Sequence, residues 1–271
     1  MTKKALCVGI NDYPIDGADL KGCVNDAHAW ASLLVDHFDF ATGDVEVLLD
    51  EAATKASILS GLKRLLAGAD RGDVLVFTNS SHGSQIPDVS GDEPTYDEVL
   101  CPYDVRDATI ADDELRELFE GLGHGVRLSV ISDSCHSGTV TRAALVDSIP
   151  GLSSPDDRRV RFLHPALFRS TRALPDPMGT RPRRMVFPQS SMNHVLVSGC
   201  LDSEYSYDAV IEGDYHGAMT FHAIRTIADA GYEITYAELA ERLTPALEAA
   251  GYAQHPQLEA RSDMKHRQVF A

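Results

Sequence analysis

The chain has 271 residues, of which 44% are hydrophobic, and a formal net charge of −17. This length suits one large α/β domain with a sizeable core. The negative charge disfavours nucleic acid and anionic membranes as partners, because binding to phosphates relies on clustered cations. No stretch approaches the length of an apolar membrane span and no signal sequence precedes the first strand, so we expect a cytoplasmic protein. The five cysteines include no Cys-x-x-Cys pair, and their odd number favours free thiols in a reducing compartment.

Apolar runs and helical stripes alternate along the chain. Short runs rich in aliphatic and β-branched residues predict strands at residues 5–10, 45–49, 74–77, 126–131 and 194–198. Residues 54–66 place apolar side chains on one helical face behind a Thr54 cap, and residues 115–122 repeat that spacing. A capping box at Thr235 begins a last helix, which we expect Pro245 to kink or interrupt. This alternation predicts a single α/β domain with a parallel sheet over the whole chain.

Two polar strings follow directly behind predicted strands. They are residues 79–85 (Asn-Ser-Ser-His-Gly-Ser-Gln) and residues 132–138 (Ser-Asp-Ser-Cys-His-Ser-Gly). In parallel sheets, ligands bind beyond the carboxyl ends of the strands. If the two strands are neighbours, His82 can accept the thiol proton of Cys135, which leaves a thiolate able to attack a carbonyl carbon. Gly83 and Gly138 would let backbone N–H groups approach an oxyanion closely, and we expect the N–H groups of Gly83 and Cys135 to hold it.

Each of these residues also has a more ordinary interpretation. A lone cysteine is usually a small buried hydrophobe, and a lone histidine is usually a satisfied polar residue. The pairing favours a catalytic interpretation, because His82 and Cys135 both lie in polar, glycine-bounded loops about fifty residues apart. His136 is a rival base, but adjacent residues on a loop or strand tend to point apart.

Several further segments match a known family. They are residues 4–13, 20–27, 96–104, 110–115, 197–202 and 216–220. Together with the two polar strings, they resemble a metacaspase, in the caspase-like group of cysteine peptidases. The resemblance implies a three-layer α/β/α caspase-like fold with a mostly parallel central sheet of about six strands. It also implies an endopeptidase that hydrolyses polypeptides after arginine or lysine through His82 and Cys135, without an organic cofactor.

The resemblance also assigns a pocket for the basic side chain of the substrate. Its residues would be Cys23, Asp26, Ser80 and Asp133. The two carboxylates are what a guanidinium or ammonium group requires. Without the resemblance, Asp26 reads as an ordinary charge near a helix N-terminus.

Acidic residues between the two strings suggest a hard cation, because crowded carboxylates repel one another unless a cation neutralises them. By resemblance to calcium-activated metacaspases, the ligands of a regulatory calcium ion would be Asp97, Asp112 and Asp113. The family's fourth acidic ligand is replaced here by Arg142, so a guanidinium could stand in for the cation, or Asp92 could complete the shell. The chain also departs from the family at Ser81, where glycine is usual.

Residues 141–190 form a long insertion rich in proline and arginine, and we expect it to be poorly regular. In the family, this connection can hold processing sites. The candidate self-cleavage positions here are Arg158, Arg159, Arg161, Arg169, Arg172, Arg181, Arg183 and Arg184. The alternative is a basic loop that offsets the acidic body of the protein.

Two other functions stay open at this point. A catalytically silent caspase-like module would bind partners without turnover. Another thiol hydrolase, such as a thioesterase or transpeptidase, would use the same Cys/His geometry on a different substrate. Under each of these hypotheses we expect a monomer.

Overall fold

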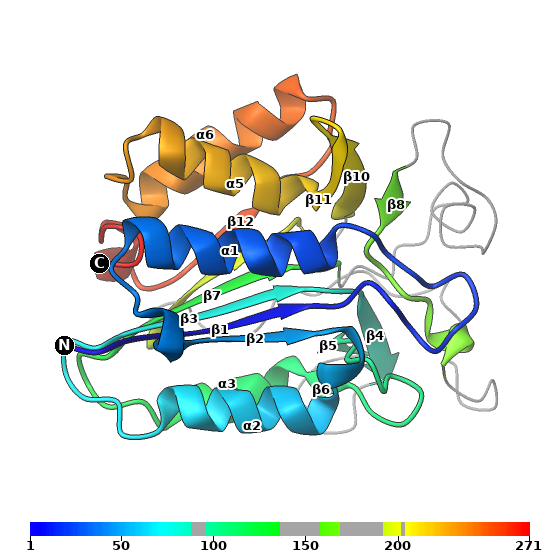
Figure 1. Cartoon of the computed structure of the whole chain (residues 1–271), viewed down its shortest axis with the longest axis horizontal. Coiled ribbons are helices and arrows are strands. Elements are labelled where there is room, and N and C mark those ends of the chain that lie inside the picture. Colours follow the sequence, from blue (N-terminus) through cyan, green and yellow to red (C-terminus); the bar gives the residue numbers. More distant parts are fainter. Residues whose placement is uncertain (88–95, 136–157, 169–191, 202–203) are drawn as a thin grey trace.

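A six-stranded sheet forms the centre of the computed structural model, which describes residues 1–87, 96–135, 158–168, 192–201 and 204–271 (Figure 1). Its strand order is β12-β9-β7-β3-β1-β2. The strands are β1 (Lys3–Gly9), β2 (Val45–Leu49), β3 (Val74–Ser80), β7 (Arg127–Asp133), β9 (His194–Ser198) and β12 (Gln257–Glu259). The first five run parallel to their neighbours, and β12 is antiparallel to β9. The expectation of a mostly parallel sheet is confirmed.

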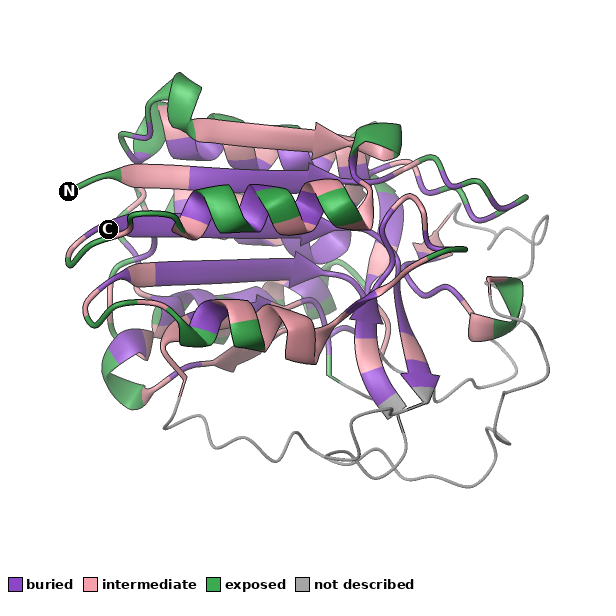
Figure 2. Cartoon of the chain, turned by 90° about the horizontal axis from the view of Figure 1, so that it is seen from below, coloured by how far each residue is buried: buried purple, intermediate pink, exposed green. Residues whose placement is uncertain are grey.

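Helices cover both faces of this sheet, which gives the three-layer α/β/α architecture (Figure 1). One layer contains α1 (Cys23–His37), α5 (Ala218–Asp229), α6 (Tyr236–Ala249) and the short α7 (Ser262–Lys265), and the other contains α2 (Lys55–Leu66) and α3 (Asp112–Glu120). Short 3-10 turns occur at η1 (Thr42–Asp44), η2 (Asp50–Ala52) and η3 (Pro165–Leu167). Figure 2 shows buried strands between helices whose outer faces are exposed. None of the helices in the described part of the chain has both the length and the apolar character needed to cross a membrane.

The strands β3 and β7 are buried along nearly their whole length, as central strands of a parallel sheet should be. Both continue further than the apolar runs predicted, because the polar residues after each run still pair with each other. The register joins Thr78 to Ile131 and Ser80 to Asp133. Each polar string therefore begins inside the sheet rather than in a loop.

Two small antiparallel sheets extend the fold beyond the carboxyl ends of the central strands. One joins β4 (Gly83–Pro87), β5 (Tyr96–Leu100) and β6 (Ile110–Ala111), and the other joins β8 (Arg159–Val160), β10 (Tyr207–Ile211) and β11 (Asp214–Gly217). The expectation of a loop after His82 was wrong, because Gly83 begins β4. In the described part of the insertion, residues 158–168, the two residues of β8 pair with β10, and η3 follows. Polar sequences form strands here because their backbone groups pair with other segments of the chain.

The helix α6 contains Pro245 and continues through it without interruption. The expected break was therefore wrong. Leu239, Leu243 and Leu247 are all buried on one face of this helix, and their packing offsets the hydrogen bond that proline cannot make. The Thr235 capping box and the Thr54 cap are both present, with the Thr54 side chain accepting a hydrogen bond from the Ser57 N–H. All five cysteines are free and buried, as expected.

Candidate functional site

The structure places His82 and Cys135 at the same edge of the central sheet. Each lies two residues beyond the end of its strand, His82 after β3 and Cys135 after β7, and these strands are parallel neighbours. Both side chains are buried. The two strings that the sequence singled out are thus adjacent in space, which follows from the shared register of their strands. The rival base His136 lies outside the described residues.

The imidazole ring of His82 is held in one orientation. Its Nε2 atom lies 2.7 Å from the carbonyl oxygen of Ala18. Because a carbonyl can only accept, Nε2 carries the proton and Nδ1 has a free lone pair. The Nδ1 atom is buried and has no hydrogen-bond partner in the described structure. Tyr13 supports the residue from the other side, since its ring centroid lies 5.0 Å from the imidazole and its hydroxyl accepts the His82 N–H.

The environment keeps His82 neutral. Burial lowers its pKa from the ordinary value of 6.5 to about 4, although the hydrogen bond to the Ala18 carbonyl opposes this shift. At neutral pH the ring is therefore a base with an unprotonated Nδ1, which is the form that accepts a proton.

The thiol of Cys135 contacts the backbone of Ser206. Its Sγ atom donates to the Ser206 carbonyl oxygen at 3.3 Å and accepts the Ser206 N–H at 2.5 Å. The side chain is fully buried and packs in a small cluster with Val160, Phe162 and Cys200. Two of these neighbours come from the insertion, so that part of the chain covers the thiol.

The insertion also places a peptide carbonyl between the two predicted oxyanion donors. The carbonyl oxygen of Arg161 accepts the Gly83 N–H at 2.9 Å and the Cys135 N–H at 3.2 Å. These are the two N–H groups that we expected from the sequence to hold an oxyanion. The arrangement is that of an oxyanion hole, in which two donors converge on one carbonyl oxygen.

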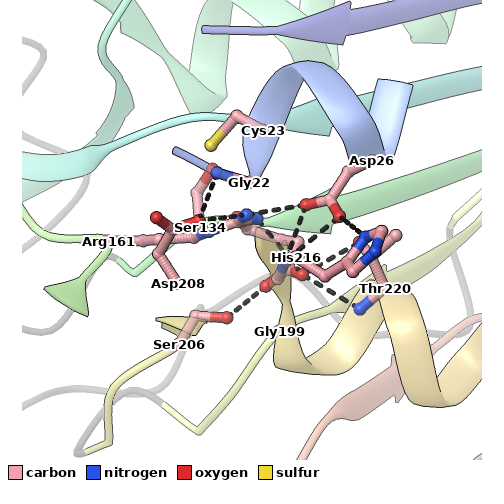
Figure 3. Close-up of polar contacts among 12 residues, drawn as sticks. Gly22, Cys23, Asp26, Ser134, Arg161, Gly199, Ser206, Asp208, His216 and Thr220 are labelled. Carbon is pink, nitrogen blue, oxygen red and sulfur yellow. Dashed lines mark hydrogen bonds and ion pairs between the residues drawn. The ribbon is translucent and has the colours of Figure 1, made fainter. Parts of the chain in front are cut away.

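The Arg161 side chain is fully buried among three carboxylates (Figure 3). Its Nη2 atom lies 2.6 Å from Asp26 Oδ2 and 3.1 Å from Asp208 Oδ1, and its Nη1 atom lies 3.2 Å from Asp133 Oδ2. The Nη1 atom also donates to the backbone carbonyl of Asp133. We call Asp26, Asp133 and Asp208 the acidic pocket.

Hydrogen bonds from the protein hold each carboxylate of the acidic pocket in place. Asp26 accepts the Gly217 N–H, and Asp208 accepts the backbone N–H groups of Lys21 and Gly22. Asp133 accepts the N–H and hydroxyl of Thr220 and the hydroxyl of Ser206. Such bonds stabilise the ionised forms, which a buried carboxylate needs besides its cation.

The room for a guanidinium group depends on glycine. A Cβ atom at Gly217 would lie 2.2 Å from Asp133 Oδ2 and 2.5 Å from Arg161 Nη1. Any side chain at this position would therefore fill the acidic pocket. Gly217 precedes α5 directly and lies at the end of β11, so this close approach belongs to the local fold.

The predicted pocket residues are brought together, but they do not contribute equally. Asp26 and Asp133 both bind the guanidinium group, and Asp26 is not an exposed charge at a helix end, because it is fully buried. The Cys23 thiol lies close by. Burial raises the pKa of this thiol, and the positive charge of Arg161 opposes the shift. Ser80 is buried at the end of β3 and faces Asp133 in the sheet register.

Sequence reasoning missed Asp208. It lies in β10, a strand of five residues with no clear polar and apolar alternation, and nothing in its spacing connects it to His82 or Cys135. Sequence reasoning also treated Arg161 only as one of several arginines in an irregular loop. In fact Arg161 is fully buried at the centre of the site.

The backbone on either side of Arg161 pairs with neighbouring segments, and Arg161 itself follows the end of β8 directly. Val160 pairs with Tyr207 and Arg159 with Asp208, both antiparallel, and the Arg161 N–H donates to the Ser206 carbonyl at 2.9 Å. Beyond Arg161 the pairing changes to β4, where Leu163 N–H donates to the Gly83 carbonyl at 2.9 Å. Backbone pairing thus holds the chain on both sides of the Arg161–Phe162 peptide bond.

The three predicted calcium ligands lie near one another. Burial and then the neighbouring Asp113 raise the pKa of Asp112 to about 6, and Asp97 contributes to the same shift. Arg116 forms an ion pair with Asp113. Among the described residues, no group of three or more side chains is arranged to hold a metal ion. Asp92 and Arg142 lie outside the described residues.

Comparisons with known proteins show the family and the fold of the chain. A family model described as "Metacaspase, peptidase C14 domain" matches residues 3–144, just over half of the chain. Metacaspase-1 of Cryptococcus neoformans is 31% identical over 99% of this chain and 64% of its own length. Metacaspase-1A of Aspergillus fumigatus is 34% identical over 94% of this chain and 68% of its own length. The crystal structure of protein GSU0716 from Geobacter sulfurreducens has the same fold, with a TM-score of 0.72, 24% identity and coverage of 100% of this chain and 99% of that one.

The fold and these matches define a caspase-like α/β/α protein. The chain belongs to the metacaspase family. It spans 64% of the length of the Cryptococcus relative, and the family model ends before the segment that contains Arg161.

Proposed function

We propose that the protein is a cysteine endopeptidase that cleaves polypeptides after arginine, and more slowly after lysine. The observation that carries this proposal is the position of Arg161. Its side chain fills the acidic pocket while its carbonyl oxygen accepts hydrogen bonds from Gly83 and Cys135. A substrate needs both contacts at once, because the first selects the residue and the second stabilises charge on the reacting carbonyl.

In the proposed mechanism, the Cys135 thiol turns from Ser206 toward the carbonyl carbon and gives its proton to Nδ1 of His82. The thiolate attacks, and the N–H groups of Gly83 and Cys135 hold the oxyanion. Protonated His82 then gives its proton to the leaving amine, which breaks the peptide bond. Water hydrolyses the thioester, with His82 accepting the proton of the water molecule.

Arginine is favoured over lysine by the shape of the acidic pocket. Asp26 and Asp208 both meet Nη2, while Asp133 meets Nη1. A planar guanidinium group reaches all three carboxylates, whereas an ammonium group is a single point charge.

The same contacts support self-processing at the Arg161–Phe162 bond. Arg161 is one of the eight candidate positions in the sequence, and it lies in the pocket with its carbonyl oxygen between the two donors. The other candidates in the described residues, Arg158 and Arg159, contact the backbone of Gly251 and Asp19 instead. Arg169, Arg172 and Arg181–184 lie outside the described residues.

Calcium is proposed as a regulatory ion with no place in the catalytic step. The support is that Asp112, Asp113 and Asp97 lie near one another, with burial and then the charges of Asp113 and Asp97 raising the pKa of Asp112 to about 6. Asp112 also lines a cavity of about 310 Å³ that extends to Ser134, the residue before Cys135. A cation near Asp112 would thus lie at the same cavity as Ser134, which precedes the nucleophile Cys135.

Fluorogenic peptides ending in arginine, lysine or aspartate test the function. We expect turnover of the arginine peptide, slower turnover of the lysine peptide and none of the aspartate peptide, each measured with calcium and with a chelator. Iodoacetamide and Cys135→Ala should both abolish turnover. No turnover of any peptide, with Cys135 inert to iodoacetamide, would instead support a silent interaction module. Turnover of a thioester, but not of a peptide, would indicate another thiol hydrolase.

The pH profile of kcat should reflect the buried environment of His82. We expect kcat to stay constant as the pH falls through 6.5 and to decline with a midpoint near 4, because burial lowers the pKa of His82 to about 4 and only the neutral ring accepts the thiol proton. The profile of kcat reports the occupied site, which is the state the structure describes. An acidic limb centred at 6.5, the ordinary value for histidine, would contradict this assignment.

A further inference from the structure

The segment N-terminal to Arg161 makes a further contact, which involves neither the acidic pocket nor His82 and Cys135. Arg158 is the fourth residue on the amino side of the Arg161–Phe162 bond, counting Arg161 as the first. Its guanidinium carbon lies 4.5 Å from the centre of the Tyr252 ring. Its Nη1 atom donates to the Gly251 carbonyl oxygen at 2.9 Å. A cation over an aromatic face with a carbonyl acceptor beside it is a recognised way to bind a guanidinium group.

The position of Arg158 follows from β8, the short strand between Arg158 and Arg161. The pairs Val160–Tyr207 and Arg159–Asp208 set the register of this strand against β10. Tyr207 also packs against Tyr252, with 6.0 Å between ring centroids. A peptide that binds with its arginine in the acidic pocket and its backbone on β10 therefore has its fourth residue next to Tyr252.

The surroundings of Tyr252 also favour a positive charge. Gly251 and Tyr252 lie just beyond α6 and its C-cap residue Ala250, and the carbonyl groups at a helix C-terminus carry a partial negative charge. Glu248 in the last turn of α6 forms an ion pair with His255, which also pairs with Glu204. The Tyr252 ring is held by contacts with Tyr207 and with His222, so it does not have to be ordered by the ligand.

We propose that Tyr252 and the Gly251 carbonyl form a subsite for an arginine or lysine side chain at the fourth position before the scissile bond. This proposal rests on the proposed function, because it extends the substrate of the same site from one basic residue to two. The chain's own segment, Arg158-Arg159-Val160-Arg161, would then be a sequence that satisfies both subsites.

The test uses tetrapeptide substrates of the form Xaa-Arg-Val-Arg with a fluorogenic leaving group, where Xaa is arginine, lysine, norleucine or glutamate. We expect the wild-type protein to prefer arginine to norleucine by about 3- to 10-fold in kcat/KM, which is the range of a partly exposed cation–π contact. In Tyr252→Leu the ratio should fall to about 1, and in Tyr252→Phe it should be kept, because the ring face is retained. Each ratio compares two peptides with the same variant. A loss of folded protein lowers both kcat/KM values equally and leaves the ratio unchanged. An unchanged ratio in Tyr252→Leu would overturn the proposal.

A second measurement does not depend on catalysis. In the Cys135→Ala protein, Arg158→Ala and Tyr252→Leu should each lower Tm, and the double variant should lower it by less than the sum of the two losses, because one contact is removed only once. Losses that add fully would overturn the subsite even if peptides are cleaved. If no peptide is cleaved but the losses do not add, the proposed peptidase activity fails while the recognition of the fourth residue is supported.

Discussion

Incubation of the wild-type chain is expected to produce two fragments, residues 1–161 and 162–271, whereas the Cys135→Ala protein keeps its single mass of 29.5 kDa. The physical reason is proximity. The Arg161 carbonyl oxygen already accepts both N–H groups of the oxyanion site, and its side chain is anchored by three carboxylates. A bond held in this way reacts intramolecularly, without the entropy cost of bringing two molecules together. Intact-mass spectrometry over time, with calcium and with chelator, measures the reaction.

Variants of the segment separate this bond from other cuts. Arg161→Ala should leave the 161–162 bond intact, and Arg161→Lys should be cut there more slowly, because an ammonium group reaches fewer carboxylates. Arg159→Ala is the matched control, since the Arg159 side chain donates a hydrogen bond to the backbone carbonyl of Asp19, outside the acidic pocket, and it should be cut within a few-fold of the wild-type rate. A wild-type chain that keeps its full-length mass under all conditions, as Cys135→Ala does, would refute self-cleavage.

Replacement of Asp26 by asparagine is expected to reduce kcat/KM for arginine peptides by about 10²- to 10³-fold, mainly through KM. Asp26 Oδ2 makes the shortest contact with the guanidinium group, at 2.6 Å, and its side chain is fully buried. Loss of one charge from a buried, hydrogen-bonded pair costs about 3–5 kcal/mol. The asparagine amide would also direct its N–H donors at either the guanidinium group or the Gly217 N–H. Both of these groups are donors themselves, so neither can accept a hydrogen bond.

The control for Asp26→Asn lies on the same helix. Asp36 is an exposed residue of α1, and Asp36→Asn changes the net charge equally without touching the acidic pocket. We expect this variant to match the wild type in kcat/KM. Steady-state kinetics with arginine and aspartate peptides, together with Tm for both variants, measure the effect. A change of less than threefold for Asp26→Asn would show that the acidic pocket does not bind the substrate.

Much of the sheet could be predicted because its signals are local. The apolar runs that begin at Val74 and Val126 mark central strands, and the polar residues after them mark the sheet edge where His82 and Cys135 both lie. The reach of each strand was underestimated, since Ser80 and Asp133 are polar but pair with each other inside the sheet. The helix interruption at Pro245 was also wrong, because burial of three leucines outweighs the local effect of proline.

The sequence by itself determined the central strands, the placement of His82 and Cys135 beyond the ends of neighbouring strands and, through resemblance, the carboxylates Asp26 and Asp133. These properties follow from the hydrophobic pattern and from motifs of a few consecutive residues. Only the tertiary structure decided the roles of Asp208 and Arg161. Asp208 joins the acidic pocket through a strand 75 residues after Asp133 in the numbering, and Arg161 through a segment that composition marks as a loop. The burial of a guanidinium group among three carboxylates depends on long-range packing, which no local pattern encodes.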